Sequence, residues 1–210
     1  MLCDCLTRGA GHGKVVPMDS ERRMGAKDSL TRAQLLDAAE ALMLEEGYAA
    51  VTSRRVGRKA GISSQLVHYY FRTMDDLFLE VFRRRAEEGF AQFEQAIVDR
   101  PTLRTIWSSL RAGPGSAFNL EFVALANHRK AIRAEMASYA ERFRTMQLEA
   151  MSSILAARAT LPDGITPEVV LVAMAGVAQL IALERALGVG GGHEQALAFV
   201  ERYLDEPAEA

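Results

Sequence analysis

Residues 47–77 read GYAAVTSRRVGRKAGISSQLVHYYFRTMDDL. Ser53 can cap a short helix that runs to about Lys59, because its hydroxyl can accept a hydrogen bond from a free amide of the first turn. Gly61 supplies the permissive backbone where this helix must end. Ser63 can then cap a second short helix. Two short helices around a glycine turn are typical of a DNA-binding helix-turn-helix.

The two short helices carry concentrated positive charge. Residues 53–72 contain five Arg or Lys residues and no Asp or Glu, whereas the whole chain has 25 basic and 27 acidic residues. A local positive patch on a chain of net charge −2 indicates a phosphate-binding surface. An arginine-rich helix can also be a solvated face. The same unit, however, carries Ser, Gln, His and Tyr side chains that can reach base edges, which favours DNA binding.

A longer ordered pattern surrounds this unit over residues 31–80. It consists of a capped helix from Thr31 with the pair Ala38-Ala39, then Gly47-Tyr48, Val51-Thr52, Val56, Ala60-Gly61-Ile62-Ser63, Tyr69-Tyr70-Phe71 and Asp76-Leu77. The pattern resembles the TetR/AcrR family of bacterial transcription regulators.

Three positions depart from the family pattern: His68 replaces a usual tyrosine, Met74 a usual lysine and Gly57 a usual alanine. Met74 removes a phosphate contact, which Arg72 would have to supply. Gly57 is expected to weaken the first short helix by up to about 1 kcal/mol relative to alanine.

The resemblance implies that the second short helix enters the major groove and that its N-terminal residues meet the bases. Gln65 can bond adenine bidentately, and Arg54 can reach a guanine or a phosphate. Leu66 can face either a thymine methyl group or the edge of the core. The predicted DNA-binding residues are Ser53, Arg54, Arg55, Ser63, Ser64, Gln65, His68, Tyr69, Tyr70 and Arg72.

Composition favours an all-α fold of about nine helices, because 49% of the 210 residues are hydrophobic, only six are proline and strand-like alternation is absent. We expect a three-helix helix-turn-helix domain over residues 28–80 and a helical effector-binding and dimerisation domain over residues 81–210. Residues 1–27 are expected to be a disordered extension or an over-called start, although Arg22, Arg23 and Lys27 could reach the minor groove.

Capping signals predict where the helices begin and end. The first helix is expected from Thr31, which forms a capping box with Gln34, and a longer helix from Thr73 to about Asp99. The remaining helices are expected from Pro101 to the Gly113-Pro114-Gly115 break, over about 116–127, over 130–160 up to a Leu161-Pro162-Asp163-Gly164 turn, from the Thr166 cap to about Leu187, and over 193–204.

The resemblance also implies a ligand cavity in the C-terminal module. Met and aromatic side chains there suit a bulky apolar or aromatic effector. The candidate lining residues are Trp107, Phe118, Glu121, Phe122, Met136, Tyr139 and Phe143, with Asn127, His128 and Arg133 as further polar anchors.

Enzymatic, metal and membrane functions find little support. The four His residues lack metal-ligand spacing, Cys3 and Cys5 have no further cysteine to join them, and the Gly188–Gly192 run lacks the ending of a P-loop. The apolar run Val169–Leu183 is shorter than the roughly 20 residues that cross a bilayer, which predicts a buried or interface helix. We expect neither a cofactor nor an association with the membrane. A cytoplasmic location is expected. An enzyme, or an all-α interaction protein with a relic helix-turn-helix, remains an alternative.

The last two helices, residues 166–204, are predicted to form a homodimer. Val170, Ala173, Met174, Val177, Leu180 and Ile181 provide more apolar surface than one core-facing stripe requires. The function predicted from these observations is a ligand-responsive regulator that binds double-stranded inverted-repeat DNA as a dimer. Repression, with release by a small-molecule effector, follows from the resemblance alone.

Overall fold

The computed structural model describes residues 18–112, 117–156 and 165–205. Within these ranges the chain is all-α, with nine α-helices, one 3-10 helix and no strand, which confirms the predicted fold class. The elements are α1 (Met18–Glu46), η1 (Tyr48–Ala50), α2 (Ser53–Ala60), α3 (Ser64–Tyr70), α4 (Met74–Asp99), α5 (Leu103–Ala112), α6 (Ala117–Ala126), α7 (Lys130–Ala156), α8 (Pro167–Ala186) and α9 (His193–Asp205).

The first helix begins at Met18, well before the predicted start at Thr31. Thr31 therefore lies inside α1, and the predicted capping box with Gln34 is wrong. The added residues contain good helix formers and no proline, so nothing in the sequence stops the helix from extending upstream. The helix includes residues 18–27 of the predicted extension, while residues 1–17 and the side chains of Arg22, Arg23 and Lys27 lie outside what the structure describes.

The predicted caps of the short helices are partly correct. Thr52, and not Ser53, caps α2, because its Oγ1 accepts from the Arg55 amide at 3.4 Å. Gly61 ends α2 in the left-handed conformation with φ 68°, and Ser63 caps α3 by accepting from the Leu66 amide at 3.4 Å. Both of these predictions are confirmed.

The longer helices begin at threonine caps. Thr73 and Asp76 form a capping box at the start of α4, with distances of 3.1 and 2.9 Å. Thr166 caps α8, and Pro167 is its first residue, as predicted. Pro101 does not open α5. Instead, the hydroxyl of Thr102 accepts a hydrogen bond from the Thr105 amide at 3.2 Å, and the helix begins at Leu103.

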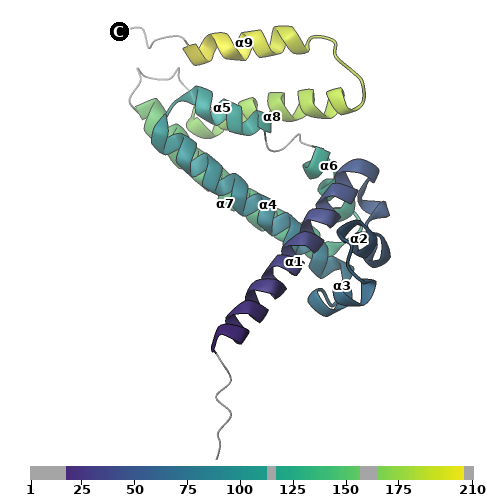
Figure 1. Cartoon of the computed structure of the whole chain (residues 1–210). Coiled ribbons are helices and arrows are strands. Elements are labelled where there is room, and N and C mark those ends of the chain that lie inside the picture. The colour runs from purple at the N-terminus through teal and green to yellow at the C-terminus, as the bar shows by residue number, and fades with distance from the viewer. Residues whose placement is uncertain (1–17, 113–116, 157–164, 206–210) are drawn as a thin grey trace, which may run out of the picture.

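Two long helices connect the ends of the molecule. Figure 1 shows α4 and α7 side by side, with α1, α2 and α3 at one end and α5, α8 and α9 at the other. The loops expected at residues 113–115 and 161–164 lie outside the described residues.

The buried side chains form two cores. The first joins α1, α2, α3 and the beginning of α4 to Phe118, Phe122 and Leu125 of α6 and Ile132 of α7. The second joins the far half of α4 to α5, the end of α7, α8 and α9. The helix-turn-helix therefore shares its core with α6, which begins 47 residues after the end of α3 (117 − 70).

Candidate nucleic-acid interface

Helix α3 has one buried face and one face in solvent. Val67 is 1% exposed and Phe71, the next residue after α3, is 3% exposed, which fixes the helix against the first core. Gln65, Leu66, His68 and Tyr69 point away from that core, and Tyr69 is 71% exposed. Since Leu66 is 41% exposed, its outward orientation is the one the structure adopts.

Helix α2 presents some of its cations to solvent and uses others internally. Arg55 forms an ion pair with Glu46, and Lys59 Nζ lies 2.6 Å from Glu45 Oε2, so both cations are bound to the end of α1. The hydrogen bond from Arg55, with the positive charge near it, lowers the pKa of Glu46.

Three other cations beside α3 remain available. Arg54 and Arg58 of α2 and Arg72 after α3 are exposed and form no ion pair with the described residues. Fewer cations are therefore available to a partner than the sequence pattern predicts. Arg55 can contact a partner only if its ion pair with Glu46 breaks.

The remaining predicted contacts lie on the same unit. Ser53 is the first residue of α2, Ser63 caps α3, and Ser64 is the first residue of α3. Tyr70 is half-buried against the first core, and its ring lies 5.1 Å from that of Tyr69 in an edge-to-face arrangement. All ten predicted residues thus lie on α2, α3 or their immediate flanks, with Tyr70 the most enclosed of the aromatic pair.

Gly57 allows the turn between the two short helices to approach α2 closely. The Ile62 amide donates to the Gly57 carbonyl at 2.8 Å. A Cβ atom on Gly57 would lie only 2.6 Å from the Ile62 carbonyl oxygen and 3.1 Å from the Ser64 amide nitrogen. The expectation that glycine merely weakens α2 is therefore incomplete, because alanine does not fit this backbone.

The predicted ligand residues are divided between the two cores. Phe118, Phe122, Met136 and Tyr139 belong to or pack on the first core, whereas Trp107 and Phe143 belong to or pack on the second. Glu121 accepts a hydrogen bond from the Tyr48 amide at 2.7 Å, so it ties α6 to η1. Tyr139 and Phe143 both lie against the ring of Phe90, at 5.7 and 5.3 Å, and the role of the seven residues in ligand binding stays a prediction.

The further polar anchors have other positions. Asn127 and His128 are exposed at the end of α6. Arg133 donates to the carbonyls of Ala126 and Asn127 at 3.2 and 3.1 Å, which satisfies the C-terminus of that helix.

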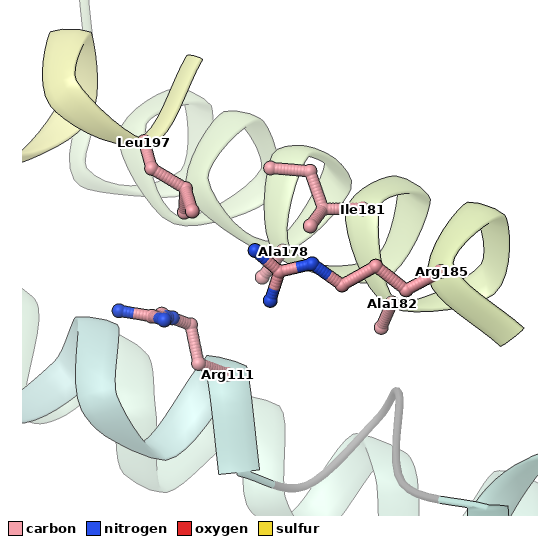
Figure 2. Close-up of a pocket in the computed structure, with 6 residues that line it drawn as sticks. All are labelled: Arg111, Ala178, Ile181, Ala182, Arg185 and Leu197. Atoms are coloured by element: carbon pink, nitrogen blue, oxygen red, sulfur yellow. The ribbon is translucent and has the colours of Figure 1, made fainter. Parts of the chain in front are cut away.

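A small hollow lies elsewhere in the C-terminal module. Figure 2 shows it between α5, α8 and α9, lined by Arg111, Ala178, Ile181, Ala182, Arg185 and Leu197. None of these residues was predicted from the sequence to line a ligand site, because they come from three helices and carry no motif; Ile181 was predicted for the dimer interface instead. Within the described residues, no group of three or more His, Cys, Asp or Glu is placed to hold a metal ion.

The comparisons with known proteins concern both sequence and fold. The family model "Bacterial regulatory proteins, tetR family" matches residues 35–81. An HTH-type transcriptional regulator of Mycobacterium bovis is 32% identical over 103 residues, which are 46% of this chain and 53% of that protein. The fatty acid metabolism regulator protein of Bacillus subtilis is 22% identical over 71 residues, 34% of this chain and 37% of that protein. The matches therefore span between about a third and about half of these relatives.

Solved structures share the fold over most of the chain. A TetR transcription regulator from Haloarcula marismortui has a TM-score of 0.70 at 20% identity and covers 86% of this chain and 100% of its own. A transcriptional regulator from Saccharomonospora viridis in complex with choline has a TM-score of 0.69 at 15% identity and covers 87% and 100%. The matched residues 35–81 run from α1 to the first turns of α4 and contain the whole helix-turn-helix. Residues 35–81 therefore belong to the tetR family of bacterial regulatory proteins, and the chain shares its fold with these solved regulators over most of its length.

Proposed function

We propose that this chain is a ligand-responsive transcription regulator that binds an inverted-repeat operator as a homodimer, most simply as a repressor. The observation that carries the proposal is the exposed row Gln65, Leu66, His68 and Tyr69 on α3. It is flanked by Arg54, Arg58 and Arg72, which form no ion pair with the residues that the structure describes. Residues 28–80 would carry DNA binding, and residues 81–210 effector binding and dimerisation. A regulator of this kind acts in the cytoplasm.

In the proposed complex, α3 lies in the major groove and α2 crosses the backbone. Gln65 is near the N-terminus of α3 and exposed, so its amide can pair with both polar edge atoms of an adenine. Leu66 supports contact with a thymine methyl group. Arg54, Arg58 and Arg72 supply phosphate contacts, which position the helix without reading sequence.

The proposed dimer interface is a stripe along α8. Val169, Val172, Leu180, Leu183 and Leu187 are 44–73% exposed and recur every three or four residues or a multiple of that spacing, so they lie on one side of the helix axis. Gly176 and Ala173 lie exposed on the same side, where small residues permit close helix approach. Met174 and Ile181, which the sequence assigned to the interface, instead face the interior at 7% and 6% exposure.

Helix α8 is also long and apolar enough, by length and composition alone, to cross a membrane. Its other side packs against α5, α7 and α9. An apolar stripe opposite a packed face is typical of a subunit interface, and a second copy of α8 and α9 would bury it in a four-helix arrangement.

The test of DNA binding starts with duplexes selected from a random library by the purified protein. Binding of a fluorescent selected duplex is measured by anisotropy at two salt concentrations, since a phosphate-binding protein loses affinity steeply as salt rises. Gln65→Ala should cost on the order of 1–3 kcal/mol at one position of each half-site. Gln92→Ala, an exposed glutamine on α4, is the matched control and should bind as the wild type does.

Two results would contradict the proposal. Selection that enriches no sequence, with no duplex bound at low salt, would favour an all-α interaction protein that has kept the helix-turn-helix shape. If Gln65→Ala lowered the affinity for selected and for random duplexes equally, direct base readout by α3 would be excluded.

A further inference from the structure

We propose that the hollow between α5, α8 and α9 binds a small amphipathic carboxylate, with the carboxylate held between Arg111 and Arg185. Nothing in the family comparison or in the sequence patterns assigns this place. Its use as the effector site would rest on the proposed regulator function, but binding itself does not.

The first argument is the shape and composition of the hollow. It is a small hollow of about 40 Å³ and is partly open to solvent. Ala178 and Ile181 of α8 are 5% and 6% exposed, and Leu197 of α9 is half-buried, so the floor is aliphatic. In Figure 2 the side chains of Arg111 on α5 and Arg185 on α8 lie on the side of Ile181 and Leu197 that faces α5.

The second argument is the charge balance. Arg111 Nη1 lies 3.4 Å from Glu201 Oε1, while Arg185 forms no ion pair with the described residues. The nearby Glu184 is already engaged, since its Oε2 lies 2.6 Å from His193 Nε2. The two guanidinium groups thus have one carboxylate partner among the described residues, that of Glu201, so one positive charge is left for a ligand carboxylate to balance.

The third argument is the match of geometry to ligand. Guanidinium groups present planar pairs of N–H donors that fit a carboxylate, and charged hydrogen bonds of this kind are stronger than neutral ones. An aliphatic floor next to them suits a short hydrocarbon chain. A hydrophilic anion would leave the floor unused, and an alcohol or amine would leave the two cations without a partner.

The hollow and the dimer stripe lie on different sides of α8. Ala178, Ile181, Ala182 and Arg185 follow one another at helical spacing toward α5 and α9, whereas the stripe with Leu180 and Leu183 points away. A bound carboxylate would therefore join α5, α8 and α9 without displacing a second copy.

The experiment is a calorimetric titration of the full chain with hexanoate, with hexan-1-ol and hexylamine as ligands of the same chain length. Trp107 is the only tryptophan, and the Arg111 guanidinium lies 6.0 Å above its ring. Its emission therefore reports movement of Arg111. We expect saturable binding of hexanoate, a change in emission, and at least about tenfold weaker binding of the alcohol and the amine.

Variants assign the binding to the hollow. Arg111→Gln and Arg185→Gln should each weaken hexanoate binding at least about tenfold, and Ala182→Leu, which keeps both arginines but fills the hollow, should do the same. Arg202→Gln, an exposed arginine on α9 outside the hollow, is the control and should bind normally.

The proposal is overturned if hexanoate does not bind at millimolar concentration, or if hexan-1-ol binds equally well. It is also overturned if hexanoate binding survives unchanged in both arginine variants. No DNA is present in this titration. A failure to bind hexanoate would therefore leave the operator-binding proposal standing, and a failure to bind operator DNA would leave the hexanoate result unchanged.

Discussion

Replacing Gly57 with alanine should destabilise the protein, although alanine is the better helix former. Alanine in a helix gains up to about 1 kcal/mol over glycine. Here the new Cβ atom would lie 2.6 Å from the Ile62 carbonyl oxygen, a backbone atom that cannot rotate away. Forcing an extra methyl group into a packed site costs about 1–3 kcal/mol. The clash therefore outweighs the propensity gain over most of this range.

The control variant Gly89→Ala separates the steric clash at residue 57 from the effect of alanine's higher helix propensity. Gly89 also lies within a helix, α4, but a Cβ there meets nothing within 4 Å. Gly89→Ala should stabilise the chain by up to about 1 kcal/mol, so the two variants should differ by about 1–3 kcal/mol. In a chain of this size that difference corresponds to a Tm gap of very roughly 2–12 °C.

Urea unfolding followed by circular dichroism measures both free energies of unfolding, and a thermal scan checks the order. The salt dependence of DNA affinity in Gly57→Ala would show in addition whether a displaced turn misplaces α3. If Gly57→Ala proves as stabilising as Gly89→Ala, the close approach of the turn to α2 is wrong.

Three further predictions concern charge, assembly and the contact between modules. Arg54→Ala should reduce the slope of log affinity against log salt by about 1.8 per dimer, since two phosphate contacts contribute about 0.9 each. Arg55→Ala should chiefly lose an exposed ion pair, at about 0.2–1 kcal/mol of stability, and equal slopes for the two variants would contradict this difference. Leu180→Glu should yield a monomer in sedimentation at micromolar concentration, whereas Val98→Glu, at another exposed apolar position on α4, should not; an unchanged dimer in Leu180→Glu would exclude the stripe. Glu121→Ala should cost about 1–3 kcal/mol in urea unfolding, because it leaves the half-buried amide of η1 without its charged acceptor; no loss would show that water replaces the contact.

Features encoded within a few residues could be predicted from the sequence. The caps at Ser63, Thr73 and Thr166 and the left-handed Gly61 each depend on hydrogen bonds that reach no further than one turn. The start of α1 could not be placed in this way, because Thr31 is a good capping residue that the longer helix does not use.

Features that depend on the angle between helices could not be predicted from the sequence. Arg55 and Glu46 are nine residues apart, and only the crossing of α1 and α2 makes them a pair. Tyr48 and Glu121 are 73 residues apart. The aromatic pattern of Phe118 and Phe122 correctly indicates burial, but burial alone does not say that the neighbours are the DNA-binding helices rather than a ligand.

These long-range contacts change how an effector could act on DNA. The sequence makes α4 the only covalent connection between the modules, but α6 also holds the DNA-binding helices, through Phe122 in the first core and the Glu121 hydrogen bond to η1. Arg129, between α6 and α7, adds an ion pair with Asp75 at the start of α4.

Close-packed cores move as rigid bodies, since their side chains have no space to rearrange gradually. The first core reaches Phe82 on α4 and Ile132 on α7, and the second begins at Phe93. Between them lies Phe90, stacked on Tyr139 at 5.7 Å and covered by the Arg142 guanidinium at 4.2 Å. A rotation of the reading helices relative to the proposed dimer helix α8 would therefore have to be taken up at this layer. An effector of the proposed regulator would then not need to touch the first core, because altering the second core, or the hollow beside it, would change the direction in which α4 leaves it.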